Sequence, residues 1–462
     1  MKKFAVRGFN LCESILRHTP DQLRRFIFRM KELGLNTLIV HYDYGWKRYR
    51  NLILDECRAA GIEITLMTFG IRSILSGSDW KADWFAKDEN GKPYLTSLEC
   101  ETHPCGAVPE VKEAFEAGLK QWLEELPPEV KRIHLRAADG YMYCRCEKCR
   151  HIPAAEQWYP FFGIFVDLAR ELRPDLKVEG DVYNMRYNLT REGAAYRKSD
   201  RIMFDTFLRH TYYPLGSGGD RLHACNLKYM ADTPLADART PNEYLLRRLE
   251  DWNREFPGGV YIHENAMKQS LLGTFQHAAP TYLKDLEIYL RMGIEGVCYE
   301  AFEPGYSAFA GMFEILAKKL NGEDFEYEED ELEKILPSTN HDVFCNDMAF
   351  PLEKYIFDPY RLKQAQLFRR FIIDYNLQVF REYAEFCLEN EDDMDYIFII
   401  YHLAKSGMNR KLFHFKGLSE PAEEMLGYRK LWDFMEKIPL SEDPRKYCKE
   451  LLIEFLNKAV QQ

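Results

Sequence analysis

The sequence contains no hydrophobic run that approaches the roughly 20 residues a helix needs to cross a bilayer. Near the start, Lys2 and Lys3 are followed by Arg7 and Asn10, and these polar residues interrupt the apolar segment that a secretion signal requires. The 12 cysteines are scattered along the chain, several of them inside expected strands and helices. This distribution is typical of a reducing compartment rather than of a disulfide scaffold. We therefore expect a cytoplasmic protein that does not contact membranes.

Motifs for phosphate-bearing cofactors are also missing. No GxGxxG motif follows the first expected strand, and GxxxxGK[ST] occurs nowhere. The net charge of -11 argues against a nucleic acid as the main partner. We therefore expect no cofactor to be required for catalysis and no nucleic-acid partner. Assembly into a homo-oligomer stays possible, because nothing in the sequence decides the oligomeric state.

The first 320 residues alternate between apolar runs of strand length and segments of helical length. Strands are expected at 4–9, 36–42, 62–69, 132–137, 177–183, 201–207, 259–263 and 296–299. Each following segment is long enough to return the chain for the next parallel strand. Eight such units with no element left over favour a closed (β/α)8 TIM barrel over a doubly wound sheet.

After residue 320 the character of the sequence changes. Residues 321–335 are rich in acidic side chains and are interpreted as a linker. Residues 336–462 carry apolar side chains at helical spacing. We therefore predict a barrel domain over 1–320 and a smaller, all-helical C-terminal domain over 336–462.

Acidic residues stand at the ends of several expected strands. Asp139 follows the fourth strand, Glu264 follows the seventh, and Glu300 follows the eighth. The carboxyl ends of barrel strands meet on one face, where catalytic groups gather. Glycoside hydrolysis needs one carboxyl group to protonate the leaving oxygen and another to attack the sugar or activate water. We predict Asp139 as the general acid and Glu264 or Glu300 as base or nucleophile; the alternative is that these acids anchor loops or cap helices.

Aromatic and basic residues accompany the same strand ends. Aromatic rings combine a flat apolar face with a polar rim, which suits sugars, and arginine pairs with the carboxylate of a uronic acid. The predicted substrate-binding residues are Tyr42, Trp46, His103, Arg136, Tyr141, Tyr183, His210, His263, Tyr299 and Glu303. The alternative for many of the aromatic residues is that they only pack loops onto the barrel.

Three cysteines form the compact segment C-x-C-x-x-C, namely Cys144, Cys146 and Cys149. Three thiolates at this spacing can bind a soft metal, with His151, Cys105 or Cys100 as a fourth ligand. A structural zinc is one hypothesis for this loop. Three reduced cysteines packing a tight loop are the other, because the sequence lacks the two separate CxxC pairs of common zinc motifs.

Residues 134–149, with their Asp-Gly pair and three cysteines, resemble a family of bacterial barrel proteins of unassigned function that is grouped with carbohydrate-active proteins. That family is distantly similar to α-glucuronidases and β-hexosaminidases. The resemblance extends over roughly residues 95–320 and includes the segment 261–264. This chain shows neither the N-terminal accessory domain nor the secretion signal common in the family, and Asn321 stands where a tryptophan often follows. The resemblance implies a glycan-related barrel and transfers no catalytic residue.

The leading hypothesis is a glycoside hydrolase-like enzyme that acts on an oligosaccharide containing a uronic acid or an N-acetylhexosamine. For an N-acetylhexosamine, the acetamido group of the substrate attacks, and the carboxylates polarise it and protonate the leaving group. Two alternatives stay open: a non-catalytic glycan-binding barrel, and a metal-dependent hydrolase or isomerase with strand-end His and Asp ligands. The metal-dependent alternative is disfavoured because no HxH motif follows the first strand, where Asn10 stands instead.

Overall fold

The structure is a computed structural model of the chain. It describes residues 2–11, 19–42, 45–71, 74–75, 81–94, 103–138, 143–183, 196–207, 209, 213–216, 240–265, 279–300, 305–324, 377–389 and 437–442, with isolated residues between 363 and 370 and between 446 and 457. Within this part of the chain, no helix is both long and apolar enough to span a bilayer.

Eight parallel strands close into a barrel in chain order, as the alternating pattern predicts. They are β1 (Val6–Leu11), β2 (Thr37–His41), β3 (Glu63–Phe69), β4 (Arg132–Arg136), β5 (Lys177–Val182), β6 (Arg201–Asp205), β7 (Val260–Glu264) and β8 (Gly296–Glu300). Strand β1 pairs with both β2 and β8, which closes the sheet and removes its edges. The (β/α)8 architecture is therefore confirmed.

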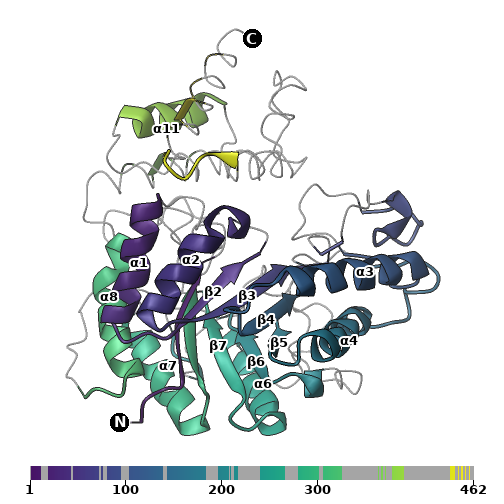
Figure 1. The fold of residues 1–462 in the computed structure, drawn as a ribbon, viewed down its shortest axis with the longest axis horizontal. Helices are drawn as coiled ribbons and strands as arrows, with labels where there is room; N and C mark the ends of the chain where they lie inside the picture. Colours follow the sequence, from purple (N-terminus) through teal and green to yellow (C-terminus); the bar gives the residue numbers. More distant parts are fainter. Residues whose placement is uncertain are drawn as a thin grey trace.

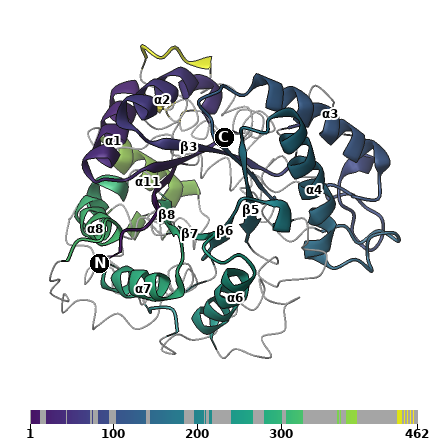
Figure 2. The same ribbon diagram turned by 60° about the horizontal axis from the view of Figure 1, so that its bottom comes forward.

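Helices surround the barrel on all sides, as Figure 2 shows. Those around it are α1 (Pro20–Glu32), α2 (Trp46–Ala60), α3 (Pro109–Glu125), α4 (Ala154–Leu172), α6 (Pro241–Glu255), α7 (Ala279–Met292) and α8 (Gly305–Leu320). A short 3-10 helix, η2 (Ala82–Trp84), lies in the connection between β3 and α3. Local signals set the helix boundaries: Thr19 caps α1 in a reciprocal pair with Gln22, and Gly61 ends α2 at a φ of 71°.

Several predicted boundaries shift. Strand β1 ends two residues later than expected, because its pairing with β2 continues as far as Leu11. Glu264 and Glu300 are the last residues of their strands rather than the first residues of the following loops. Helix α4 begins at Ala154 and continues through Pro160 even though proline has no amide hydrogen to donate.

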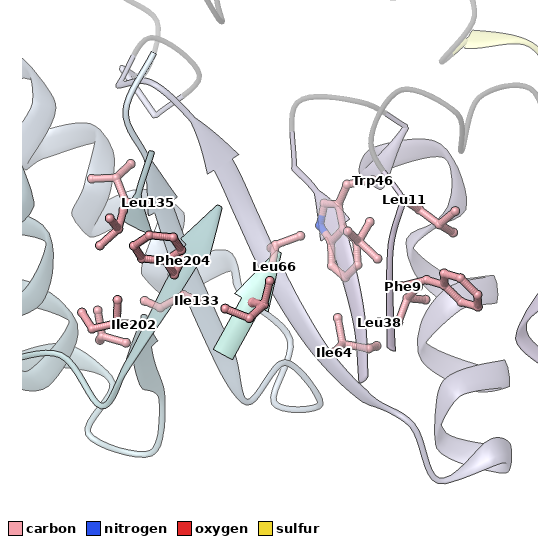
Figure 3. Packing of buried hydrophobic residues seen from close by; sticks show 14 of the residues in the cluster. Phe9, Leu11, Leu38, Trp46, Ile64, Leu66, Ile133, Leu135, Ile202 and Phe204 are labelled. Atoms are coloured by element: carbon pink, nitrogen blue, oxygen red, sulfur yellow. The ribbon is translucent and has the colours of Figure 1, made fainter. Parts of the chain in front are cut away.

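Both faces of the barrel sheet are buried, as expected for parallel strands covered by helices. Outward side chains such as Phe9, Leu38 and Ile133 join the apolar layer between strands and helices (Figure 3). Inside the barrel, a smaller apolar cluster comprises Val6, Ile39, Met67, Met203, Tyr261 and Cys298. Polar and charged side chains occupy the remaining interior toward the carboxyl ends of the strands.

Helix α11 (Leu377–Glu389) lies beyond the ends of α1 and α2 in Figure 1. Tyr383 and Ile438 are buried in the same apolar core as the barrel helices, and Arg48 of α2 donates to the carbonyl of Pro439 at 3.2 Å. The C-terminal segment thus packs on the barrel. Most of the predicted linker and helical domain lies outside the described residues, so their boundaries stay a prediction.

Candidate functional site

The strand register defines which side chains point into the barrel, because residues paired across parallel strands share a face. Met67 and Met203 belong to the interior cluster, so their partners His41 and Asp181 also point inward. The inward positions nearest the carboxyl ends are Asn10, His41, Phe69, Arg136, Asp181, Asp205, His263 and Glu300. We call these eight residues the mouth layer.

A continuous chain of polar contacts crosses the mouth layer. His41 Nε2 lies 3.1 Å from Asn10 Oδ1, and Asn10 Nδ2 lies 2.7 Å from His263 Nε2. His263 Nδ1 lies 2.8 Å from Asp205 Oδ2, and Arg136 donates to the same carboxylate. Because the Asn10 amide nitrogen can only donate, His263 Nε2 accepts and Nδ1 carries the proton toward Asp205. The chain therefore sets one tautomer and one ring orientation for His263.

Asp205 is the charged centre of this network. Its carboxylate also accepts from the amide of Phe207 and from Asn265 Nδ2, both at 2.7 Å. Burial alone raises the pKa of Asp205, but Arg136 and His263 together outweigh it and hold the pKa below its ordinary value. A carboxylate that stays ionised and accepts four hydrogen bonds orients its neighbours and is unsuited to donate a proton.

The guanidinium of Arg136 also lies against aromatic rings. Its central carbon is 4.0 Å from the ring centroid of Tyr183 and 5.2 Å from that of Phe69. Such stacking restricts the rotation of the arginine, and its guanidinium forms an ion pair with the carboxylate of Asp205. Two of the predicted substrate-binding residues, Arg136 and Tyr183, thus form one rigid unit at the mouth.

A second buried polar group lies beneath the mouth. His134 stands between Glu179, at 3.9 Å, and Asp181, at 3.7 Å, and Tyr261 donates to Glu179 at 2.7 Å. Burial opposes protonation of His134, but the two carboxylates outweigh it and raise its pKa. The two carboxylates therefore favour the protonated form of this histidine, which was not among the predicted site residues.

The structure separates two of the predicted catalytic acids. Glu300 points into the barrel, because it pairs in register with the inward Asn10. Glu264 pairs with the outward Tyr299 and points toward the helices. Asp139, the third predicted acid, lies outside the described residues, three positions after the last residue of β4.

Glu264 belongs to a buried cluster between the barrel and α7. It accepts from Thr206 Oγ1 at 2.7 Å and from Arg209 Nη1 at 2.9 Å, and the hydroxyl of Tyr289 lies 3.4 Å away. Arg209 also pairs with Asp285 of α7 at 2.6 Å. Burial raises the pKa of Glu264, and Arg209, which is shared with Asp285, does not fully offset this effect. These contacts give Glu264 the environment of a structural ion pair.

The remaining predicted substrate-binding residues fall into four groups. His263 lies in the mouth layer, while His103 lies on the loop before α3, with its ring 4.6 Å from that of Tyr143. Three lie in the layer between barrel and helices, where they do not face the mouth: Tyr42 against Trp122, Trp46 in the first turn of α2, and Tyr299 against Tyr282 and Phe313. Tyr141, His210 and Glu303 lie outside the described residues.

Asn10 and His41 were not among the predicted site residues, although they complete the hydrogen-bond chain. The alternation within β1 and β2 contains the signal, because each is an inward position at the end of its strand. Burial lowers the pKa of His41 well below its ordinary value, so this ring is neutral at pH 7. The mouth histidines form no metal-binding group among the described residues, where the only such cluster is made of cysteines.

That cluster lies beside the mouth, on the loops that follow β3 and β4. It joins Cys144, Cys146 and Cys149 to Cys105, and all four sulfur atoms lie within 4.8 Å of one another. Cys105 is one of the three fourth ligands considered from the sequence. His151 is not part of the cluster, and Cys100 lies outside the described residues.

No protein-family model matches the sequence, and the curated proteins contain no match. Among solved structures, the chain is similar to the β-galactosidase of the Antarctic haloarchaeon Halorubrum lacusprofundi, at 12% identity and a TM-score of 0.45, over 63% of this chain and 52% of that one. It is also similar to the endo-β-1,4-mannanase of Thermotoga petrophila, at 11% identity and a TM-score of 0.43, over 71% of this chain and 79% of that one. The chain thus spans about half of the β-galactosidase, and the likeness extends no further than the fold.

Proposed function

We propose that the chain is a glycoside hydrolase that acts on an oligosaccharide at the carboxyl end of its barrel. The observation that supports this most is the position of Glu300, an inward carboxylate at the mouth with 9% of its surface exposed. The other carboxylates of the described mouth layer, Asp181 and Asp205, are fully buried. A catalytic carboxyl group must reach both substrate and water, and of these three carboxylates Glu300 is the one that keeps some exposed surface.

The second carboxyl group of the proposed pair is Asp139. Its strand, β4, stands opposite β8 in the closed order of eight strands. Side chains that follow β4 and end β8 can therefore approach a bond in the mouth from opposite sides. In this proposal Asp139 protonates the leaving oxygen, and Glu300 attacks the sugar or activates a water molecule.

The network around His263 has a positioning role in this proposal. Asp205 and Asn10 hold the imidazole in one orientation, and Arg136 stacks on the ring of Tyr183, with both rings almost fully buried. Such a rigid floor keeps the groups of the mouth in place when a sugar arrives.

The sugar itself can be a uronide or an N-acetylhexosaminide. Within the described residues, Arg136 forms an ion pair with Asp205, and Arg209 forms ion pairs with Glu264 and Asp285. These two arginines therefore do not favour an acidic sugar over a neutral one, and the substrate screen must include both classes.

The proposal is tested by a hydrolysis screen with aryl glycosides, aryl uronides, aryl N-acetylhexosaminides and the corresponding oligosaccharides. Asp139→Asn and Glu300→Gln are each expected to lower turnover about 10²–10⁴-fold, as for loss of a general acid or base. Glu124→Gln, at an exposed position on α3, is the matched control and should behave as the wild type. Full activity in both site variants would contradict the proposed pair, and sugar binding without turnover by the wild type would support the glycan-binding alternative.

A further inference from the structure

The four clustered cysteines are spaced for a metal ion. The Sγ atom of Cys105 lies 3.4 Å from that of Cys144 and 3.9 Å from those of Cys146 and Cys149. Four sulfur atoms at about 2.3 Å from a tetrahedral zinc ion are separated by about 3.8 Å. A disulfide needs a separation of about 2.05 Å, and all four cysteines are free thiols. We propose that Cys105, Cys144, Cys146 and Cys149 bind one structural zinc ion.

The local backbone arranges these ligands without help from a metal. The amide of Cys149 donates to the carbonyl of Cys146 at 2.9 Å, which closes a turn that brings both thiols to one side. Gln157 of α4 accepts from the amide of Cys144 at 3.1 Å and donates to the carbonyls of Cys144 and Cys149, at 3.1 and 3.3 Å. One glutamine side chain thus fixes the loop to a rigid helix, as the outer-shell partners of metal ligands do.

The surroundings also suit the charge of such a site. Four thiolates around a divalent ion leave an excess of negative charge, which needs donors and cations nearby. The backbone amide of Lys87 donates to the sulfur of Cys144 at 3.4 Å. Three basic residues are neighbours of the ligands in sequence: Arg145, Lys148 and Arg150.

The apolar cluster around the four thiols is small. It consists of Ala86 and three of the four cysteines, with Tyr94, Ala107 and Val108 partly buried against it. Small side chains bury little apolar surface, so this cluster by itself contributes little hydrophobic stabilisation to the contact between the two loops. Metal binding supplies folding free energy in small domains.

The site joins two connections at the barrel mouth. Cys105 belongs to the loop between β3 and α3, while the other three ligands belong to the loop between β4 and α4. Backbone contacts already link the two loops, since the amide of Arg145 donates to the carbonyl of Lys87 at 2.6 Å. Four protein ligands leave no open coordination position, so the zinc is structural rather than catalytic. It does not depend on the sugar chemistry of the mouth.

The test is the metal content of the folded, full-length chain, purified without chelators or metal-affinity columns and measured by mass spectrometry of the elements. We expect one zinc per chain in the wild type, and loss of that zinc in Cys105→Ser and Cys146→Ser. Cys57→Ser is the matched control, because this buried thiol lies on α2 apart from the cluster, and it should retain the zinc.

Two measurements on the wild type keep the test decisive if the cysteine variants fail to fold. Titration with a mercurial thiol reagent should release zinc to a coloured indicator as the clustered thiols react. Protein produced with cobalt should show the near-ultraviolet sulfur-to-cobalt absorption of a tetrathiolate site. Folded wild type without zinc, iron in place of zinc, or full zinc retention in Cys105→Ser would each overturn the proposal.

Discussion

Strands β7 and β8 both end in a glutamate, and the structure places the two side chains on opposite faces of the barrel sheet. Glu264 is held in a buried ion pair outside the barrel, whereas Glu300 faces the mouth. Replacing each by glutamine removes a charge with little change in shape. We expect Glu264→Gln to lose stability and Glu300→Gln to lose activity.

The magnitude for Glu264 follows from its contacts. Removing one partner of a buried ion pair costs about 3–5 kcal/mol, because the other charge stays buried. Arg209 keeps its contact with Asp285 at 2.6 Å, and glutamine keeps an oxygen that can accept from Thr206. We therefore expect a smaller loss of unfolding free energy, about 2–3 kcal/mol.

For Glu300→Gln we expect an unfolding free energy within about 1 kcal/mol of the wild type, since glutamine has nearly the same shape and this side chain is the least buried of the mouth carboxylates. Turnover should fall about 10²–10⁴-fold. The assay is urea unfolding followed by tryptophan fluorescence, combined with hydrolysis of the best substrate from the screen. If Glu264→Gln abolished turnover at unchanged stability, while Glu300→Gln stayed active, the assignment of the two faces would be wrong.

Three further predictions concern the barrel interior. Asp205→Asn should lower the unfolding free energy by about 3–5 kcal/mol, because it leaves the buried guanidinium of Arg136 without its carboxylate; urea unfolding that matches the wild type would contradict this. The raised pKa of His134 means that its stabilising contribution is complete below its unfolded pKa, near 6.5, and is lost as pH rises through the higher folded value. The stability difference between wild type and His134→Gln should therefore shrink above pH 6.5, and a difference that grew with pH would refute the assigned direction. Gly8→Ala should prevent folding, since its Cβ would lie 1.8 Å from a carbonyl oxygen of β2, whereas Gly163→Ala on α4 has open space and should stabilise by about 0.5–1 kcal/mol; circular dichroism and thermal unfolding distinguish the two outcomes.

The barrel could be predicted from the sequence because its signals are local. Apolar runs of strand length, helical segments between them and turn residues such as Gly61 depend on neighbours along the chain. The C-x-C-x-x-C segment and the acidic strand ends are local patterns in the same sense. These patterns predicted the fold class and the loops that carry the candidate chemistry.

The faces of the strand-end residues were decided only by the tertiary structure. Glu264 and Glu300 each end a strand of five residues, yet Glu264 pairs with Tyr299, one residue before Glu300. In a closed barrel the stagger between neighbouring strands determines which side chain enters the interior, and a shift of one residue turns it to the other face. No local sequence pattern predicts this stagger between neighbouring strands. The same holds for Cys105, which lies 39 residues before Cys144 and reaches it only because adjacent strands bring their following loops together.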